Sequence, residues 1–146
     1  MNKLFQNTFL VAAVCAAFSA AAFATEVTVY KSPTCGCCKE WVKHMQANGF
    51  TVTTRDVADI VYYKKANGVP ITLGSCHTAK VDGYVIEGHV PASDIRRLLK
   101  ERPPVKGLAA PGMPNGAPGM AQAGPKDRYD VLSFDNQGNT AVYARH

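Results

Sequence analysis

Three cysteines within four residues, Cys35, Cys37 and Cys38, are the most reactive feature of this 146-residue chain. A fourth, Cys76, stands directly before His77. Thiolate sulfur is a soft ligand that binds Cu(I), zinc and iron-sulfur clusters. Cys35 and Cys38 also have the i, i+3 spacing of a redox dithiol. The motif therefore supports both a metal site and disulfide chemistry.

The residues around these cysteines predict a strand that leads into a helix. Val27–Tyr30 is β-branched and aromatic, Ser32-Pro33-Thr34 predicts a turn, and residues 37–48 have the apolar spacing of a helix. The three cysteines then lie at a helix N-terminus. Free N–H groups and the helix dipole stabilise thiolate there, which favours both metal binding and nucleophilic attack.

The rest of residues 25–101 predicts one small α/β domain. Asp82-Gly83 is the dipeptide of a tight hairpin turn, and Pro103-Pro104 ends the last helix. The resulting order, β-α-β-α-β-β-α, is that of the thioredoxin fold. Beyond the first strand and helix, the predicted elements are strand 50–54, helix 56–67, strands 75–81 and 84–90, and a helix from Pro91 to Lys100.

Residues 1–24 predict a cleaved signal peptide. An apolar run over 9–22 precedes Ala22-Phe23-Ala24, the small-x-small pattern of a cleavage site. The run is shorter than the about 20 strongly apolar residues of a membrane-spanning helix. We therefore expect export to the periplasm without a membrane anchor, and Cys15 is lost with the leader.

The remaining composition excludes some partners. Removing 24 residues from 146 leaves 122, and the loss of Lys3 lowers the formal net charge from +5 to +4. The positive residues form no cluster with interleaved aromatics, which makes nucleic acid a poor candidate partner. Four cysteines in an oxidising compartment would by default form two disulfides. Thiols kept crowded there need a metal or a dedicated reductant.

Two segments follow the predicted domain. Residues 102–125 are rich in proline and glycine and contain Pro-Gly-Met twice, at 111–113 and 118–120. This composition predicts an extended arm without a packed element. Residues 126–146 predict a β-hairpin around Asn136–Asn139 that adds to the same domain.

The crowding of the cysteines favours a polynuclear soft-metal site, copper above all. Structural zinc sites usually combine a C-x₂₋₄-C pair with a second pair, whereas here three sulfurs share one turn. Thiolates that bridge several Cu(I) ions can all take part, because each sulfur can bind more than one metal. A metal-free redox dithiol at Cys35 and Cys38, a zinc site and plain disulfides remain as alternatives.

The other soft ligands can be sorted by position. Cys76 begins a strand that lies beside the first strand in a thioredoxin topology, so it could complete a four-sulfur site. His89 ends the next strand and is the best histidine candidate. We expect His77 to face away from Cys76, His44 to be a surface or packing residue, and His146 to be free.

Methionine and proline add two open questions. Thioether sulfur suits Cu(I), so Met113 or Met120 could cover the site, with Met113 favoured; otherwise the arm is only a tether. The thioredoxin fold places a cis-proline before its third strand. Val69-Pro70 is then either that cis bond or an ordinary trans proline that ends the second helix.

Several segments, taken in order, carry a resemblance to a known family. They are 29–38 (VYKSPTCGCC), 68–70 (GVP), 75–78 (SCHT), 83–84 (GY), 87–91 (EGHVP) and the two Pro-Gly-Met copies. Together they resemble the CopG-type periplasmic copper-resistance proteins over essentially the whole mature chain. The resemblance implies a thioredoxin-like domain and a cysteine-bridged copper cluster. It implies the ligands Cys35, Cys37, Cys38 and Cys76, with His89 and Met113 as further candidates.

Three function classes stay open. The resemblance implies a copper oxidoreductase that interconverts Cu(I) and Cu(II), with copper ions and other periplasmic copper-handling proteins as partners. A carrier or buffer without catalysis would need the same sulfurs. A thiol-disulfide enzyme of the thioredoxin kind would use Cys35 and Cys38 as its catalytic pair, although Cys37 would tend to form wrong disulfides.

Overall fold

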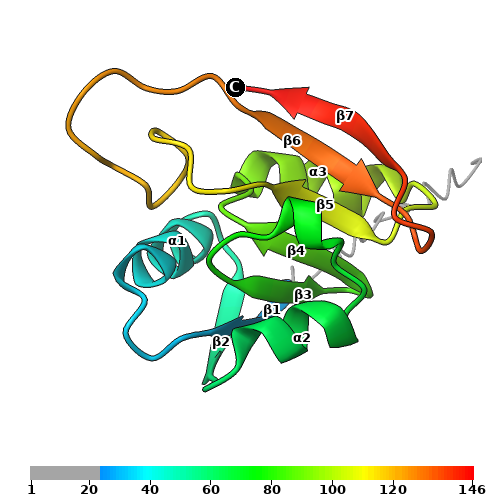
Figure 1. The fold of residues 1–146 in the computed structure, drawn as a ribbon, viewed down its shortest axis with the longest axis horizontal. Coiled ribbons are helices and arrows are strands. Elements are labelled where there is room, and N and C mark those ends of the chain that lie inside the picture. Colours follow the sequence, from blue (N-terminus) through cyan, green and yellow to red (C-terminus); the bar gives the residue numbers. More distant parts are fainter. Residues whose placement is uncertain (1–23) are drawn as a thin grey trace, which may run out of the picture.

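A computed structural model describes residues 24–146, so the predicted signal peptide lies outside the described residues apart from Ala24. A seven-stranded sheet in the order β2-β1-β3-β4-β5-β6-β7 carries helices on both faces (Figure 1). The elements are β1 (Glu26–Lys31), α1 (Gly36–Ala47), β2 (Thr51–Asp56), α2 (Ile60–Ala66), the 3₁₀ turn η1 (Ile71–Leu73), β3 (Thr78–Val81), β4 (Tyr84–Gly88), α3 (Ala92–Glu101), β5 (Gly107–Ala110), β6 (Asp130–Phe134) and β7 (Thr140–Arg145).

The order from β1 to α3 agrees with the predicted order of strands and helices. β1 pairs in parallel with β2 and antiparallel with β3, and β3 pairs antiparallel with β4. Asp82 and Gly83 join β3 to β4 with φ of 45° and 87°, the left-handed backbone that a two-residue hairpin turn requires. The start of β3 therefore lies beside the end of β1, near the cysteine-bearing turn.

Alternating side chains divide the apolar core between the two faces of the sheet. Val27, Val29 and Ile86 face α1 and α3, whose Trp41, Met45, Ile95 and Leu98 complete a fully buried cluster. On the other face a smaller cluster lies beneath the segment after α2. It consists of Val69, Leu73, Val85, Ala109 and Phe134.

Two predicted boundaries shift because of side-chain contacts. β2 continues to Asp56, which pairs with Lys31 in register and as an ion pair. The second helix therefore begins at Ile60, after Asp59 caps it by accepting a hydrogen bond from the backbone N–H of Tyr62. Similarly, regular pairing of β3 begins at Thr78 and leaves residues 75–77 irregular.

The prediction that all of 102–125 lacks a packed element is wrong for Gly107–Ala110. These residues form the buried strand β5, parallel to β4 and antiparallel to β6. Gly107 is required because a Cβ there would lie 1.8 Å from the Val85 carbonyl oxygen. Small side chains allow this close packing, and they are also why the segment resembles a linker in sequence.

The predicted C-terminal hairpin is present as β6 and β7, and it extends the same sheet. The prediction that His146 is free is wrong. Its Nε2 lies 2.8 Å from Oδ2 of Asp94 on α3, and its ring stacks on Tyr129. The Val69-Pro70 bond is trans, since residues 24–146 contain no cis peptide, so the alternative of a cis proline is wrong.

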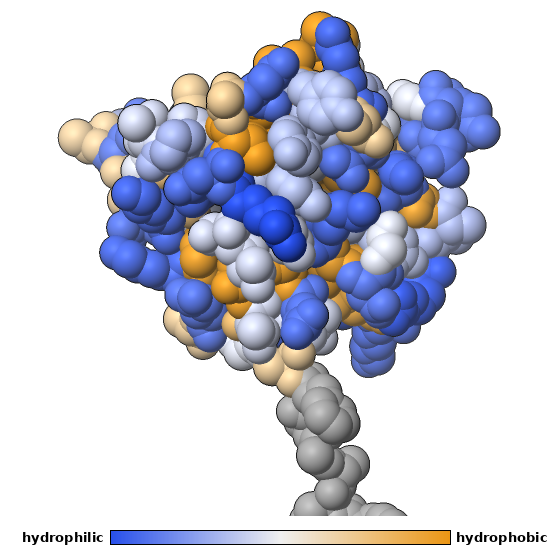
Figure 2. Space-filling view, turned by 90° about the horizontal axis from the view of Figure 1, so that it is seen from below, coloured by the Kyte–Doolittle hydropathy of each residue, from blue (hydrophilic) through white to orange (hydrophobic). Residues whose placement is uncertain are grey.

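The surface seen from below Figure 1 is largely hydrophilic with small apolar patches (Figure 2). Large apolar side chains that remain exposed in the described residues include Val61, Tyr62 and Ile71 around α2 and η1. None of the helices in residues 24–146 is long and apolar enough to cross a membrane.

Candidate metal centre

The first turn of α1 positions three sulfurs. Cys35 is the N-cap, and its Sγ accepts a hydrogen bond from the backbone N–H of Cys38 at 3.3 Å. Cys35 and Cys38 are joined in a disulfide, as their i, i+3 spacing allows. Cys38 is fully buried, whereas Cys35 and Cys37 are partly accessible.

Cys37 connects this turn to the opposite side of the site. Its Sγ lies 3.6 Å from Sγ of Cys35 and 3.6 Å from Sγ of Cys76. Two groups of ligand atoms, each within 4.8 Å of one another, result: Cys35, Cys37 and Cys38, and Cys37, Cys76 and His89. Cys37 belongs to both groups, so the structure brings together all four cysteines and the histidine predicted from sequence.

A buried carboxylate holds the Cys76 segment in place. Glu87 is completely buried and accepts hydrogen bonds from the Ser75 backbone N–H at 2.7 Å and the Thr78 hydroxyl at 2.7 Å. Lys64 of α2 forms an ion pair with the same carboxylate. The two residues between Ser75 and Thr78 are Cys76 and His77. Glu87 therefore anchors both ends of the segment, which sequence patterns alone did not indicate.

His89 has the arrangement of a metal ligand. Its Nδ1 lies 2.7 Å from the carbonyl oxygen of Pro118, so Nδ1 carries the proton and donates it. Its Nε2 is buried without a hydrogen-bond partner in the described residues. A histidine whose one nitrogen is fixed by a backbone carbonyl presents the lone pair of the other nitrogen to a metal.

His77 is a second buried histidine beside the site. Its ring lies 4.4 Å from that of Trp41 and 5.1 Å from that of His89, measured between centroids. Both of its ring nitrogens are buried without partners in the part of the chain described. His77 is completely buried and belongs to neither group of ligand atoms.

Burial sets the protonation of the potential ligands. Burial, followed by contact with Cys37, raises the pKa of Cys76 from 9.0 to about 11. Burial also lowers the pKa of His77 well below 6.5 and lowers that of His89. The imidazoles are thus neutral, as metal ligation requires, while Cys76 stays a thiol until a metal displaces its proton.

The residues 111–120 that carry the methionines lie across the site. Ser75 forms a bridge with Gly112, and the Pro118 carbonyl contacts His89. A Cβ at Gly119 would lie 2.9 Å from the Cys37 carbonyl oxygen, so this glycine lets the two backbones approach closely. Met113 is 59% exposed, whereas Met120 is 6% exposed. The segment covers the cysteine turn with its backbone.

His44 does not belong to the site. Its Nε2 accepts a hydrogen bond from the backbone N–H of Ala92 at 3.1 Å, which ties α1 to the first residue of α3. Burial, with Arg96 nearby, lowers the pKa of His44. Of the two roles predicted for His44, surface or packing, this contact supports the packing role.

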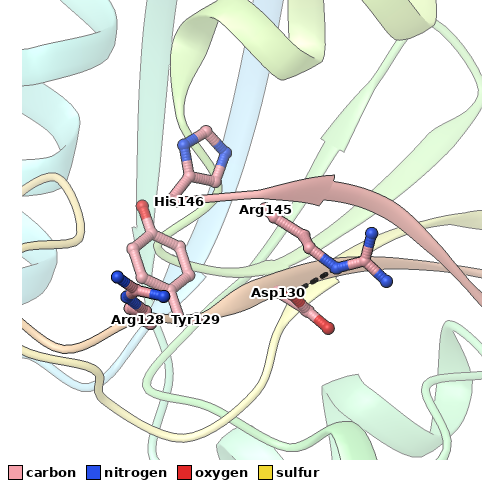
Figure 3. Close-up of a pocket in the computed structure, with 5 residues that line it drawn as sticks. All are labelled: Arg128, Tyr129, Asp130, Arg145 and His146. Atoms are coloured by element: carbon pink, nitrogen blue, oxygen red, sulfur yellow. Dashed lines mark ion pairs between the residues drawn. The ribbon is translucent and has the colours of Figure 1, made fainter.

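A separate hollow of about 620 Å³ lies at the C-terminal strand pair (Figure 3). Tyr129 and His146 stack along one part of it, and Arg145 forms a 3.7 Å ion pair with Asp130. Arg128 completes the lining. No cysteine lines this hollow.

Two solved structures are similar to this chain over most of its length. A solved structure named "Copper resistance protein copG- Form 2" is 44% identical, covering 85% of this chain and 99% of its own, with a TM-score of 0.81. The "Form 1" structure is also 44% identical over 85% of this chain and 98% of its own, with a TM-score of 0.80. The chain belongs to the CopG family of copper resistance proteins.

A family model also matches part of the chain. The family described as "Protein of unknown function, DUF411" matches residues 73–120, the stretch from the Cys76 segment to the second Pro-Gly-Met. No curated protein matches the chain. The mixed α/β domain of this chain, with its seven-stranded sheet, matches the CopG fold, and its four cysteines and His89 lie in groups that could bind a metal.

Proposed function

We propose that the protein binds copper as its substrate in a cysteine-bridged polynuclear cluster and interconverts Cu(I) and Cu(II) during copper resistance. The observation that carries the proposal is the position of Cys37, whose sulfur belongs to two adjacent groups of ligands. A bridging thiolate between two ions needs such a position. When Cys35 and Cys38 are reduced, four sulfurs and one imidazole face one another.

The donor set suits copper better than hard cations. Thiolate selects Cu(I), and imidazole binds both oxidation states, so Cys37, Cys76 and His89 provide a mixed site for either ion. His89 is neutral and its free Nε2 is buried. Met113 remains a proposed additional ligand, and Met120 is the methionine that is buried beside Gly116 and Ala117.

The proposal also covers the cellular location and the fold class of the protein. We place the protein in the periplasm, with other copper-handling proteins as partners, because of the leader predicted from residues 1–24. We assign the region from β1 to α3 to the thioredoxin-like class because a dithiol turn follows its first strand and β3 lies beside β1.

A second candidate function is a thiol-disulfide oxidoreductase that works without copper. The disulfide between Cys35 and Cys38 at the start of α1 favours it. This function needs neither Cys76 nor His89. A reductase assay on protein stripped of metal, with insulin disulfides as substrate, separates it from the copper function.

The test of the copper function is an anaerobic Cu(I) titration of the reduced protein, followed by metal analysis and sulfur-to-copper absorption. We expect more than one Cu(I) per chain, and stronger binding of Cu(I) than of Zn(II) in competition. A stoichiometry that stops at one ion would reject the cluster, and preference for zinc would reject copper as the substrate.

A further inference from the structure

The two groups of ligand atoms are not equivalent once Cys35 and Cys38 form a disulfide. Both sulfurs of that bond leave the first group, which then has only Cys37. The second group, Cys37, Cys76 and His89, keeps all its members, because Cys37 and Cys76 remain free thiols. The oxidised protein therefore retains a complete three-ligand site beside its disulfide.

Cys37 lies in contact with both the disulfide and the three-ligand site. Cys37 Sγ is 3.6 Å from the disulfide sulfur of Cys35 and 3.6 Å from Cys76 Sγ. An ion held by Cys37 is consequently bonded to an atom in contact with the dithiol. Cys35 is the partly exposed member of that pair and Cys38 the fully buried one. A metal ion bound by Cys37 would therefore lie close to the Cys35–Cys38 pair.

We propose that the Cys35–Cys38 dithiol is the internal reductant for Cu(II) bound by Cys37, Cys76 and His89. Each of the two thiols releases one proton and gives up one electron, and a single bond forms between the two sulfurs. Two Cu(II) ions accept one electron each and become Cu(I). The inference rests on the proposed copper function and adds to it the source of the electrons.

The mechanism predicts that the same step changes the copper capacity. Disulfide formation removes two of the four bridging sulfurs, so the oxidised protein has ligands for one Cu(I) at the Cys37, Cys76 and His89 site. The remaining two-sulfur, one-nitrogen donor set suits Cu(I). Reduction of Cu(II) by the dithiol therefore releases Cu(I) beyond the first ion to a chelator. A dithiol from a partner would restore the pair by thiol-disulfide exchange.

The test begins with the fully reduced chain carrying Cys15→Ser, so that four thiols remain. Two equivalents of Cu(II) sulfate are added without oxygen, Cu(I) is measured with a chromogenic chelator before and after denaturation, and thiols are alkylated after denaturation and mapped by mass spectrometry. We expect the chelator to find one Cu(I) per chain before denaturation and two after it, with a disulfide at Cys35–Cys38 and alkylated Cys37 and Cys76. A disulfide that maps to Cys37–Cys76 overturns the inference.

Two double variants in this background separate the roles. Cys35→Ser with Cys38→Ser should still bind one Cu(I) supplied as Cu(I), yet reduce Cu(II) at least tenfold more slowly. Cys37→Ser with Cys76→Ser keeps the dithiol and should also reduce Cu(II) at least tenfold more slowly, because the ion is no longer held beside it. Reduction at the wild-type rate by either variant overturns the inference.

The wild-type measurement distinguishes failure of the inference from failure of the copper function. If the chain retains Cu(I) against the chelator but no Cys35–Cys38 disulfide forms, only the internal reductant is rejected. If the reduced chain retains no Cu(I) at all, the copper function is rejected and the inference with it. Neither result depends on whether a variant folds.

Discussion

The two segments that carry the cysteines are positioned in different ways. Cys35, Cys37 and Cys38 occupy the first turn of α1, and the hydrogen bond from the Cys38 backbone N–H to Cys35 is local to that turn. Cys76 instead lies in the irregular residues before β3. Its position depends on pairing of β3 with β1 and on buried Glu87, which comes from β4.

From this difference we expect the Cys76 half of the site to be more sensitive to distant substitutions than the turn that carries Cys35, Cys37 and Cys38. A helix N-terminus forms wherever its own sequence forms a helix. The Cys76 segment needs a buried ion pair between Lys64 and Glu87, groups from α2 and β4, and such pairs are costly when one partner is lost. Changes far from Cys76 in sequence should therefore affect the site.

Cys37→Ser should have the largest effect on the site, because Cys37 lies between the cysteine turn of α1 and the Cys76 segment. We expect copper binding to fall from more than one ion to at most one, since neither group of ligand atoms then has three members. Reductase activity of the Cys35–Cys38 pair should persist. Metal analysis after desalting gives the copper content, and unchanged loading would contradict the bridging role.

Glu87→Gln should weaken the Cys76 half alone. Lys64 would lose its charged partner in a site where its side chain is only 13% exposed. We expect the free energy of unfolding to fall by about 3 kcal/mol, measured by urea denaturation of the metal-free protein. The copper-thiolate absorption should lose the contribution of Cys76, while the Cys35–Cys38 disulfide still forms.

The matched control for Glu87→Gln is Asp82→Asn. Asp82 pairs with Arg102, and the two side chains are 51% and 53% exposed. Loss of a pair that is open to solvent on both sides should cost about 0–1 kcal/mol and leave the copper spectrum unchanged. Equal effects of the two substitutions would mean that Glu87 acts only on general stability.

The Cys76 thiol should react slowly in the folded, metal-free protein. Its pKa of about 11, against an ordinary 9.0, lowers the thiolate fraction near pH 8 about a hundredfold. Alkylation by iodoacetamide, followed by mass spectrometry, should be slower by about that factor than for the same residue in urea. Equal rates would show that Cys76 is not held in its buried environment.

Acid should destabilise the metal-free protein through the buried His77. Because its folded pKa lies well below 6.5, the unfolded state binds a proton that the folded state does not, once the pH falls below about 6.5. Stability should fall by up to ~1.4 kcal/mol per pH unit for this group. His77→Phe should make the decline shallower, while His44 and His89 retain part of it.

The smallest effects concern the two methionines, which test whether residues 111–120 contribute more than backbone. Met113→Ala should leave the stability of the metal-free protein nearly unchanged because its side chain is 59% exposed, whereas Met120→Ala removes a buried side chain. If a thioether binds Cu(I), its loss lowers the copper reduction potential. Voltammetry that shows equal potentials for wild type and both variants would make the segment a cover without ligands.

Features that depend on neighbours along the chain could be predicted from the sequence alone. The cysteine turn at the start of a helix, the Asp82-Gly83 hairpin and the element order follow from local backbone preferences and from apolar periodicity. The cysteines themselves also indicated a site that could bind a metal. These properties need no knowledge of which distant residues meet.

Contacts between residues far apart in the sequence could be seen only in the tertiary structure. The structure contains the strand β5 in a segment that resembled a linker. Gly107 is needed there for close packing against β4, and glycine is a poor indicator of a strand in a sequence. The structure also fixed His146 against Asp94, and it brought Glu87 to Ser75 and Pro118 to His89. Each of these contacts joins residues from different strands, helices or loops, and local preferences carry no information about such meetings.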